Sequence, residues 1–231
     1  MNKETLEQNY RAVTANIQQA CKRSGRSPDE VGVIAVTKYV GIETTEAVLD
    51  LGVGHIGESR AQEAVPKWEA LGNRGTWHFI GHLQRNKVKD VVGRFTYIHS
   101  LDRFSLAQEI SKRAAQKEVT VRALLQVNVA GEESKFGLSP DEVVEFSREV
   151  AALPHLTVAG LMTMAPHVPN SEEVRPIFRE LRALRDKLDT YRGASEKQLE
   201  LSMGMSNDYE VAVEEGATMV RVGSSLVGRE R

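Results

Sequence analysis

Short apolar runs that alternate with amphipathic helical segments constrain the fold of this chain more than any other feature. The first run, Val31–Lys38, is apolar on both faces, as a strand buried in a parallel sheet requires. Further strands are expected at 55–57, 77–80, 97–99, 121–129, 156–164, 198–203 and 219–222. Eight strand–helix units in 231 residues predict an α/β fold, a single (β/α)8 TIM barrel, as one domain over residues 1–231.

Helical patterns fill the segments between these strands. Residues 2–24 precede the first strand and have apolar residues at helical spacing, so an extra N-terminal helix is expected. Capping boxes are expected at 139–142 and at 207–210. An open, doubly wound sheet is the alternative fold. It calls for fewer strands and a glycine-rich turn after the first strand, which YVGIE (39–43) does not provide.

The composition argues against several classes of function. With 41% apolar and 27% charged residues and a net charge of −2, the chain has no general field for nucleic acid or an anionic membrane. The single cysteine, Cys21, cannot form an intrachain disulfide, which fits a reducing compartment. A signal-peptide core and an apolar stretch of about 20 residues are both missing, so a cytoplasmic location is expected. The six histidines match no zinc motif, and no metal site is expected.

Lys38 is the first candidate for chemistry, because barrel enzymes carry their sites at the carboxyl ends of the strands. A lysine at the end of a buried strand lies at the rim of a packed core, where burial favours the uncharged amine. A free amine attacks carbonyl groups and forms Schiff bases. The alternative is a lysine that ends the strand and extends into water.

The end of the last strand offers a phosphate site. Gly223 allows a close backbone approach, and Ser224 offers an N–H and a hydroxyl, in the loop where barrels of this type often bind phosphate. Ser202 can supply another hydroxyl. A carbonyl-seeking amine opposite a phosphate site suggests pyridoxal 5′-phosphate (PLP), with Arg221 facing the pyridine nitrogen. Gly and Ser also form ordinary turns, and Arg221 in a rim ion pair is the plainer interpretation.

Several motifs resemble the YggS/PROSC family of pyridoxal phosphate homeostasis proteins. The similarity spans nearly the whole chain, and the motifs are specific in combination. The matching stretches are AVTK (35–38), Gly57–Glu63, WHFIGHLQRNK (77–87), SKFGL (134–138), GLMTM (160–164), LSMGMSND (201–208) and VRVGSSLVG (220–228). The family is similar to the barrel domain of alanine racemase, the type III fold of PLP enzymes, without the second domain of that enzyme.

The resemblance implies Lys38 as the Schiff-base lysine and Arg221 at the pyridine nitrogen. It places the phosphate at Ser202, Gly223 and Ser224. Three further residues are expected to contribute to PLP binding: Ser59, where the family usually has Asn, His78 as a pocket-wall residue, and Met203, for which the core is the alternative place.

We expect a PLP carrier rather than an enzyme. A PLP enzyme needs a positioned acid or base and a group that holds the substrate carboxylate, and Tyr39 is expected to point away from Lys38. The resemblance implies reversible binding of PLP, buffering of the free cofactor and transient contact with apo PLP enzymes, with the chain as a monomer. A PLP-dependent amino-acid racemase is one alternative, and a barrel that binds phosphate metabolites without a Schiff base is another.

Overall fold

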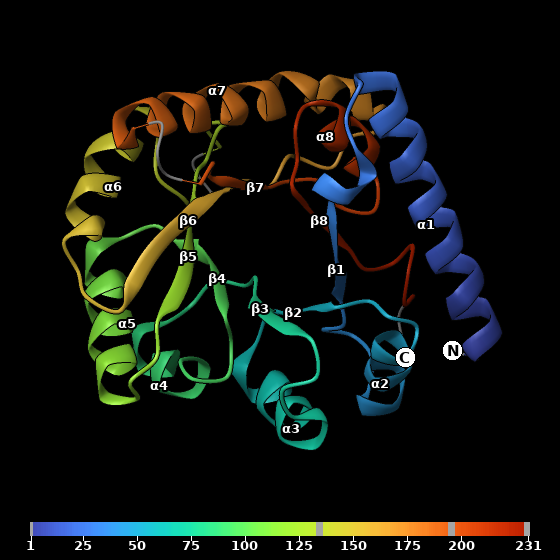
Figure 1. Ribbon diagram of the computed structural model, residues 1–231, viewed down its shortest axis with the longest axis horizontal. Coiled ribbons are helices and arrows are strands. Elements are labelled where there is room, and N and C mark those ends of the chain that lie inside the picture. Colours follow the sequence, from blue (N-terminus) through green and yellow to red (C-terminus); the bar gives the residue numbers. More distant parts are fainter. Residues whose placement is uncertain (1, 133–135, 194–196, 229–231) are drawn as a thin grey trace.

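The computed structural model describes residues 2–132, 136–193 and 197–228. Within these ranges the chain forms a closed barrel of eight parallel strands in sequence order, with β8 paired to β1 (Figure 1). The strands are β1 (Gly32–Val36), β2 (His55–Glu58), β3 (Thr76–Phe79), β4 (Tyr97–Leu101), β5 (Val121–Gln126), β6 (Leu156–Met162), β7 (Glu200–Ser202) and β8 (Met219–Val222). The predicted (β/α)8 barrel is confirmed.

Helices surround the strands on the outside of the barrel (Figure 1). They are α1 (Lys3–Ser24), α2 (Ile42–Asp50), α3 (Ala61–Leu71), α4 (Val88–Val91), α5 (Phe104–Gln116), α6 (Val143–Ala151), α7 (Arg175–Arg192) and α8 (Tyr209–Glu214). Short 3-10 turns lie at η1 (Pro28–Glu30), η2 (Arg85–Lys87), η3 (Pro140–Glu142) and η4 (Ser171–Val174). The extra N-terminal helix is confirmed as α1.

Apolar side chains form two separate layers. The larger layer fills the space between the strands and the helices, while a small cluster fills part of the barrel interior. The members of this inner cluster are Ile34, Tyr97, Leu124, Ala159, Met162 and Met219. Because the inner cluster is small, buried polar side chains such as His78, His99 and Arg221 occupy much of the remaining interior.

Some predicted element ends need correction, and so does one predicted helix cap. The fifth strand was expected to reach residue 129, but β5 ends at Gln126, and the Asn128 side chain then donates to the Glu132 carbonyl in a turn. The capping box at 139–142 is present, whereas the one at 207–210 is wrong: α8 begins after Asp208, whose carboxylate accepts from the Met205 N–H. The Asn207 amide instead contacts His167.

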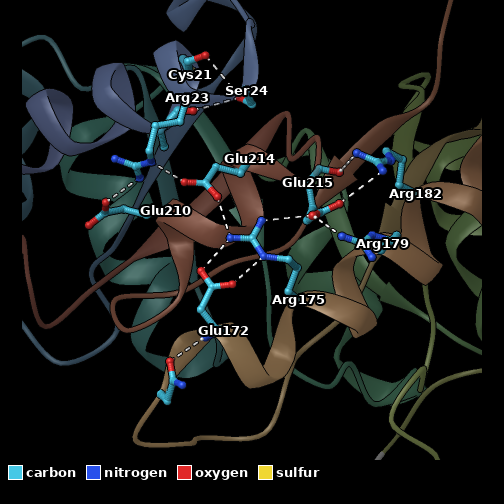
Figure 2. A network of polar contacts seen from close by, with 12 residues as sticks. Cys21, Arg23, Ser24, Glu172, Arg175, Arg179, Arg182, Glu210, Glu214 and Glu215 are labelled. Atoms are coloured by element: carbon cyan, nitrogen blue, oxygen red, sulfur yellow. Dashed lines mark hydrogen bonds and ion pairs between the residues drawn. The ribbon is translucent and has the colours of Figure 1, made fainter.

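Helix α1 packs beside α8 and contacts the segment after β8, and thereby covers the part of the barrel where α8 has only 6 residues. The Asn16 side chain donates to the Tyr209 hydroxyl at 2.9 Å, and that of Asn9 donates to the Leu226 carbonyl at 3.0 Å. At the other end of α1, Arg23 pairs with two glutamates of the α8 region (Figure 2). The added helix therefore belongs to the packing of the barrel.

Arg175 at the start of α7 is the centre of an ion-pair network (Figure 2). Its guanidinium lies 2.7 Å from Glu172, 2.6 Å from Glu214 and 3.1 Å from Glu215. Partial burial opposes ionisation of Glu215, but hydrogen bonds from Arg175 and Arg179 prevail and lower its pKa. Because Glu214 also pairs with Arg23, the network joins α1, α7 and the end of α8.

Cys21 is buried on the inner face of α1, and burial raises the pKa of its thiol, as expected for a packing residue.

In the described ranges, no helix has both the length and the apolar character needed to cross a bilayer.

Candidate functional site

A cavity of about 250 Å³ opens at the carboxyl ends of the strands. The structure brings five of the predicted site residues together around it: Lys38, Ser59, Arg221, Gly223 and Ser224. These residues come from the ends of β1, β2 and β8, which converge because the strands are parallel and the barrel is closed.

A second cavity, of about 440 Å³, adjoins the first, and Lys38, Tyr39 and Ser59 line both. Its far wall includes His82, whose ring stacks on Phe136 with 3.9 Å between centroids. The Lys38 side chain is half-buried at the boundary, so its amine is accessible from both cavities. Ser134 and Lys135 of the SKFGL motif lie outside the described residues.

Three buried polar groups hold the backbone just before Lys38. The hydroxyl of Thr37 donates to the Glu58 carboxylate at 2.6 Å, and the Lys67 ammonium donates both to that carboxylate and to the Thr37 carbonyl, at 2.7 Å each. Burial raises the pKa of Glu58, and the Lys67 charge opposes this effect. Glu58 from β2 and Lys67 from α3 therefore fix the position from which the Lys38 side chain extends.

Two glycines allow β2 and the loop after it to lie against their neighbours. A Cβ at Gly81 would lie only 2.2 Å from the Ser59 carbonyl oxygen, and a Cβ at Gly57 would lie 2.8 Å from Ile34. Any larger residue at Gly81 would push the backbone away. The close approach brings Ser59 to the boundary between the two cavities.

Backbone N–H groups converge in the loop after β8. The N–H groups of Gly223 and Ser225 point at the Ser206 hydroxyl, at 3.3 and 3.4 Å, and Ser206 and Ser224 both line the first cavity. The turn is closed by the Leu226 N–H, which donates to the Gly223 carbonyl at 2.9 Å. Converging N–H and hydroxyl donors of this kind suit an anion such as a phosphate group.

Arg221 presents a buried cation to the cavity. Its guanidinium donates to the Ser202 hydroxyl at 2.6 Å and to the Thr163 carbonyl at 2.9 Å. In the described part of the chain no carboxylate is paired with it. Burial lowers the pKa of Arg221 to about 10, so the group stays charged at neutral pH. A guanidinium has five N–H donors, which leaves donors for a ligand that carries a hydrogen-bond acceptor.

Three predicted site residues lie away from this cavity: Ser202 is not at the expected phosphate site, His78 does not line the pocket wall, and Met203 takes a core position, one of the two expected for it. His78 and Ser202 point into the barrel interior, below the mouth, and are fully buried. Ser202 contacts Arg221 and His99 there, so its hydroxyl is not at the loop after β8. Met203 directly follows Ser202, the last residue of β7, and packs on the opposite side, in the outer apolar layer.

Sequence analysis missed two residues of the site. Ser206, rather than Ser202, is the hydroxyl beside Gly223, and the SMGMS motif that contains both serines was the available signal. Tyr39 was expected to point away, but its ring centroid lies 5.0 Å from the Lys38 nitrogen. The turn after β1 begins at Lys38, so strand alternation no longer determines where Tyr39 points.

The fold and site define a βα barrel whose mouth holds an amine, a buried guanidinium and a loop of converging N–H and hydroxyl donors. Residues 8–231 match the family model described as "Alanine racemase, N-terminal domain". A protein of Aquifex aeolicus named pyridoxal phosphate homeostasis protein is 45% identical over 220 residues, which is 95% of this chain and 96% of the relative. Its namesake in Escherichia coli is 34% identical, covering 96% of both chains. The chain belongs to the pyridoxal phosphate homeostasis protein family, whose barrel is the alanine racemase N-terminal domain.

Solved structures agree with this assignment. PipY of Synechococcus elongatus, in a structure with PLP bound, superposes with a TM-score of 0.79 at 31% identity, over 92% of this chain and all of PipY. A protein from Bifidobacterium adolescentis superposes with a TM-score of 0.90 at 34% identity, covering 97% and 95% of the two chains. Alanine racemase of Clostridium difficile shares the fold at 16% identity and a TM-score of 0.74, over 56% of its own length.

Proposed function

We propose that this chain binds PLP through a Schiff base on Lys38 and holds it for buffering and delivery, without turnover of substrates. The observation that carries the proposal is the common cavity lined by Lys38, Arg221, Gly223 and Ser224. The PLP-bound relative PipY supports the choice of ligand.

Each part of the coenzyme has a partner of matching chemistry. Lys38 would form a C=N bond to the aldehyde carbon, and the aldehyde oxygen would leave as water. The donors at Gly223, Ser224 and Ser206 suit the phosphate, and the buried guanidinium of Arg221 suits the pyridine nitrogen. When bound, PLP supplies an electrophilic carbon and an electron sink. Arg221, which keeps its proton, would donate to the ring nitrogen, keep that nitrogen unprotonated and so weaken the sink.

The exposed mouth supports a carrier. Tyr39 and Met164 line the cavity while 51% and 38% exposed, so water and larger molecules can reach Lys38. Catalysis on PLP intermediates is favoured by exclusion of water, whereas exchange with another protein requires access.

One observation favours the racemase alternative. The Tyr39 ring lies beside the Lys38 amine, and the second cavity offers His82 as a further proton-transfer group. The alternative predicts amino-acid racemisation well above the rate with free PLP, lost in Lys38→Ala and strongly reduced in Tyr39→Phe. The carrier proposal predicts no rate above that background.

Reduction and mass spectrometry test the covalent link. Protein incubated with PLP and reduced with borohydride should carry the coenzyme on Lys38, and Lys38→Ala should lose both the modification and the visible absorbance. Lys89→Ala, an exposed lysine outside both cavities, is the matched control and should behave like the wild type. Modification of a different lysine in the wild type would refute the proposal.

The phosphate site is tested by comparing PLP with pyridoxal, which lacks the phosphate. Wild type should bind PLP more tightly, and Ser206→Ala should reduce the preference by about tenfold, the effect of one hydrogen bond to a charged group. Ser224→Asp places a negative charge at the site and should abolish the preference. An unchanged preference in both variants would place the phosphate elsewhere.

A further inference from the structure

A column of hydrogen-bonded polar side chains crosses the barrel interior and ends at Arg221. His55 contacts His78 through ring nitrogens at 2.9 Å, His78 contacts His99 at 2.9 Å, and His99 contacts the Ser202 hydroxyl at 2.9 Å. Ser202 in turn accepts from Arg221 at 2.6 Å. The column therefore links the amino end of β2, at the bottom of the barrel, to the guanidinium in the candidate site.

The register of the strands produces this column. His55 lies opposite Thr76, two residues before His78, and His78 lies opposite Tyr97, two residues before His99. From each strand to the next, the histidine therefore lies two residues closer to the carboxyl end than the residue paired with the preceding histidine. Because side chains alternate along a strand, a shift of two residues keeps all three rings on the inner face, and the stagger of the barrel strands brings them into contact.

Arg221 fixes the direction of every hydrogen bond in the column. A guanidinium can only donate, so Ser202 must accept from it. The Ser202 hydroxyl hydrogen then has one partner among the described residues, the Nδ1 atom of His99. His99 must carry its hydrogen on Nε2 and donate to Nδ1 of His78, which in the same way donates from Nε2 to Nδ1 of His55.

The surroundings favour three neutral rings. Burial lowers the pKa of His78 and of His99 well below the usual value, and neighbouring cations act in the same direction, Arg122 on His78 and Arg221 on His99. Burial also lowers the pKa of His55, against the opposing charge of Glu200. The remaining titratable neighbour, Tyr97, stacks on His78 and has its pKa raised to about 12, so it stays neutral.

We infer that Ser202, His99, His78 and His55 form one polarised column of neutral side chains that positions Arg221 toward the ligand cavity. Ser202 is the direct contact, and the histidines act through it as positioning residues. A proton added at Nδ1 of His55 would force His78 and His99 to donate in the opposite direction. The Ser202 hydroxyl would then face two donors, Nδ1–H of His99 and the Arg221 guanidinium. The column therefore holds the guanidinium as a donor toward the cavity. The positioning role rests on the proposed binding of PLP; the direction of the column does not.

Nitrogen NMR of histidine-labelled protein without PLP tests the column itself. His55, His78 and His99 should each show one protonated nitrogen, Nε2, from neutral pH down to about pH 6, below the ordinary histidine pKa of ~6.5. Ser202→Ala should shift the ring signals of His99 and, through it, of His78. Ser100→Ala is the matched control, because Ser100 follows His99 on β4, is buried, and its hydroxyl has no hydrogen-bond partner among the residues that the structure describes. A ring protonated on Nδ1, or on both nitrogens, in the wild type would overturn the inference.

PLP binding to the same variants tests the positioning role. Ser202→Ala should weaken binding by about tenfold, the effect expected for a lost buried hydrogen bond, and should shift the absorbance maximum of bound PLP. His78→Phe keeps the ring stacking on Tyr97 but breaks the column, and should change the spectrum in the same direction. Ser100→Ala should change neither property.

The outcomes separate the two proposals. Wild-type affinity and spectrum in both Ser202→Ala and His78→Phe would overturn the positioning role. If the wild type shows the three expected tautomers but takes up no PLP, the proposed function fails while the direction of the column is supported.

Discussion

Replacing Lys67 by methionine would leave the Glu58 carboxylate buried without its ion-pair partner. Glu58 is 0% exposed, and its remaining hydrogen bond comes from Thr37. Removing one partner of a buried pair costs about 3–5 kcal/mol, because the other charge is left uncompensated. Since proteins of this size are stable by about 5–15 kcal/mol, we expect Lys67→Met to lose a large part of its unfolding free energy at pH 7.

The loss should depend on pH in a defined direction. Burial already raises the pKa of Glu58, and without the Lys67 charge the folded-state pKa rises further above the unfolded value of about 4.3. An acid with a raised folded-state pKa destabilises the fold above its unfolded pKa, by about 1.4 kcal/mol per pH unit until the folded-state pKa is reached. The unfolding free energy of Lys67→Met should therefore fall as the pH rises from about 5 toward neutrality, more steeply than in the wild type.

Urea unfolding at several pH values measures both effects. Lys22→Met, on the exposed face of α1, is the matched control and should change stability by less than about 0.5 kcal/mol. The double variant Glu58→Gln/Lys67→Met removes the buried charge and should lose the added pH dependence. If Lys67→Met stays within about 1 kcal/mol of the wild type at pH 7, with an unchanged pH slope, the argument for a buried ion pair is refuted.

Two further predictions concern the barrel and the network around α7. Gly160→Ala should lower the unfolding free energy, measured in urea, by about 2 kcal/mol or more, because the added Cβ would lie 2.1 Å from the Glu200 carbonyl oxygen. If the variant is as stable as the wild type, β6 and β7 can separate at low cost, and the argument is refuted. Glu215 has a lowered pKa, so its ion pairs add stability above the unfolded pKa of about 4.3, and this contribution is lost as the pH falls through the lower folded-state value. Glu215→Gln should therefore reduce stability at pH 7 by about 1 kcal/mol and flatten the acid limb of the stability curve, whereas an unchanged acid limb would contradict the role of Arg175 and Arg179.

The barrel was predictable from the sequence because it depends on a repeated pattern. The alternation of apolar runs and helices fixed the order of the strands, and the rule that sites lie at the carboxyl ends of strands placed Lys38 and Gly223 at one mouth. The ends of elements were less accurate, as at β5, where the Asn128 turn replaces the last expected strand residues.

The interior column was not predicted, because it depends on register. His78 was correctly placed on a strand, but only the two-residue step between neighbouring strands shows that it meets His55 and His99. The three histidines are separated by 23 and 21 residues, about one strand–helix unit each, and this spacing was the available signal. Ser202 was assigned to the phosphate for a similar reason, since the sequence does not show how far below the mouth a strand residue lies.

The packing of α1 has a consequence for the order of folding. Its side-chain partners Tyr209 and Leu226 lie 193 and 217 residues further along the chain. Contacts between such distant segments form slowly, because a long loop must close before they are gained. Because α1 is synthesised before the last strand–helix unit, its apolar face stays uncovered until that unit forms, and until then it is open to chaperones and to aggregation.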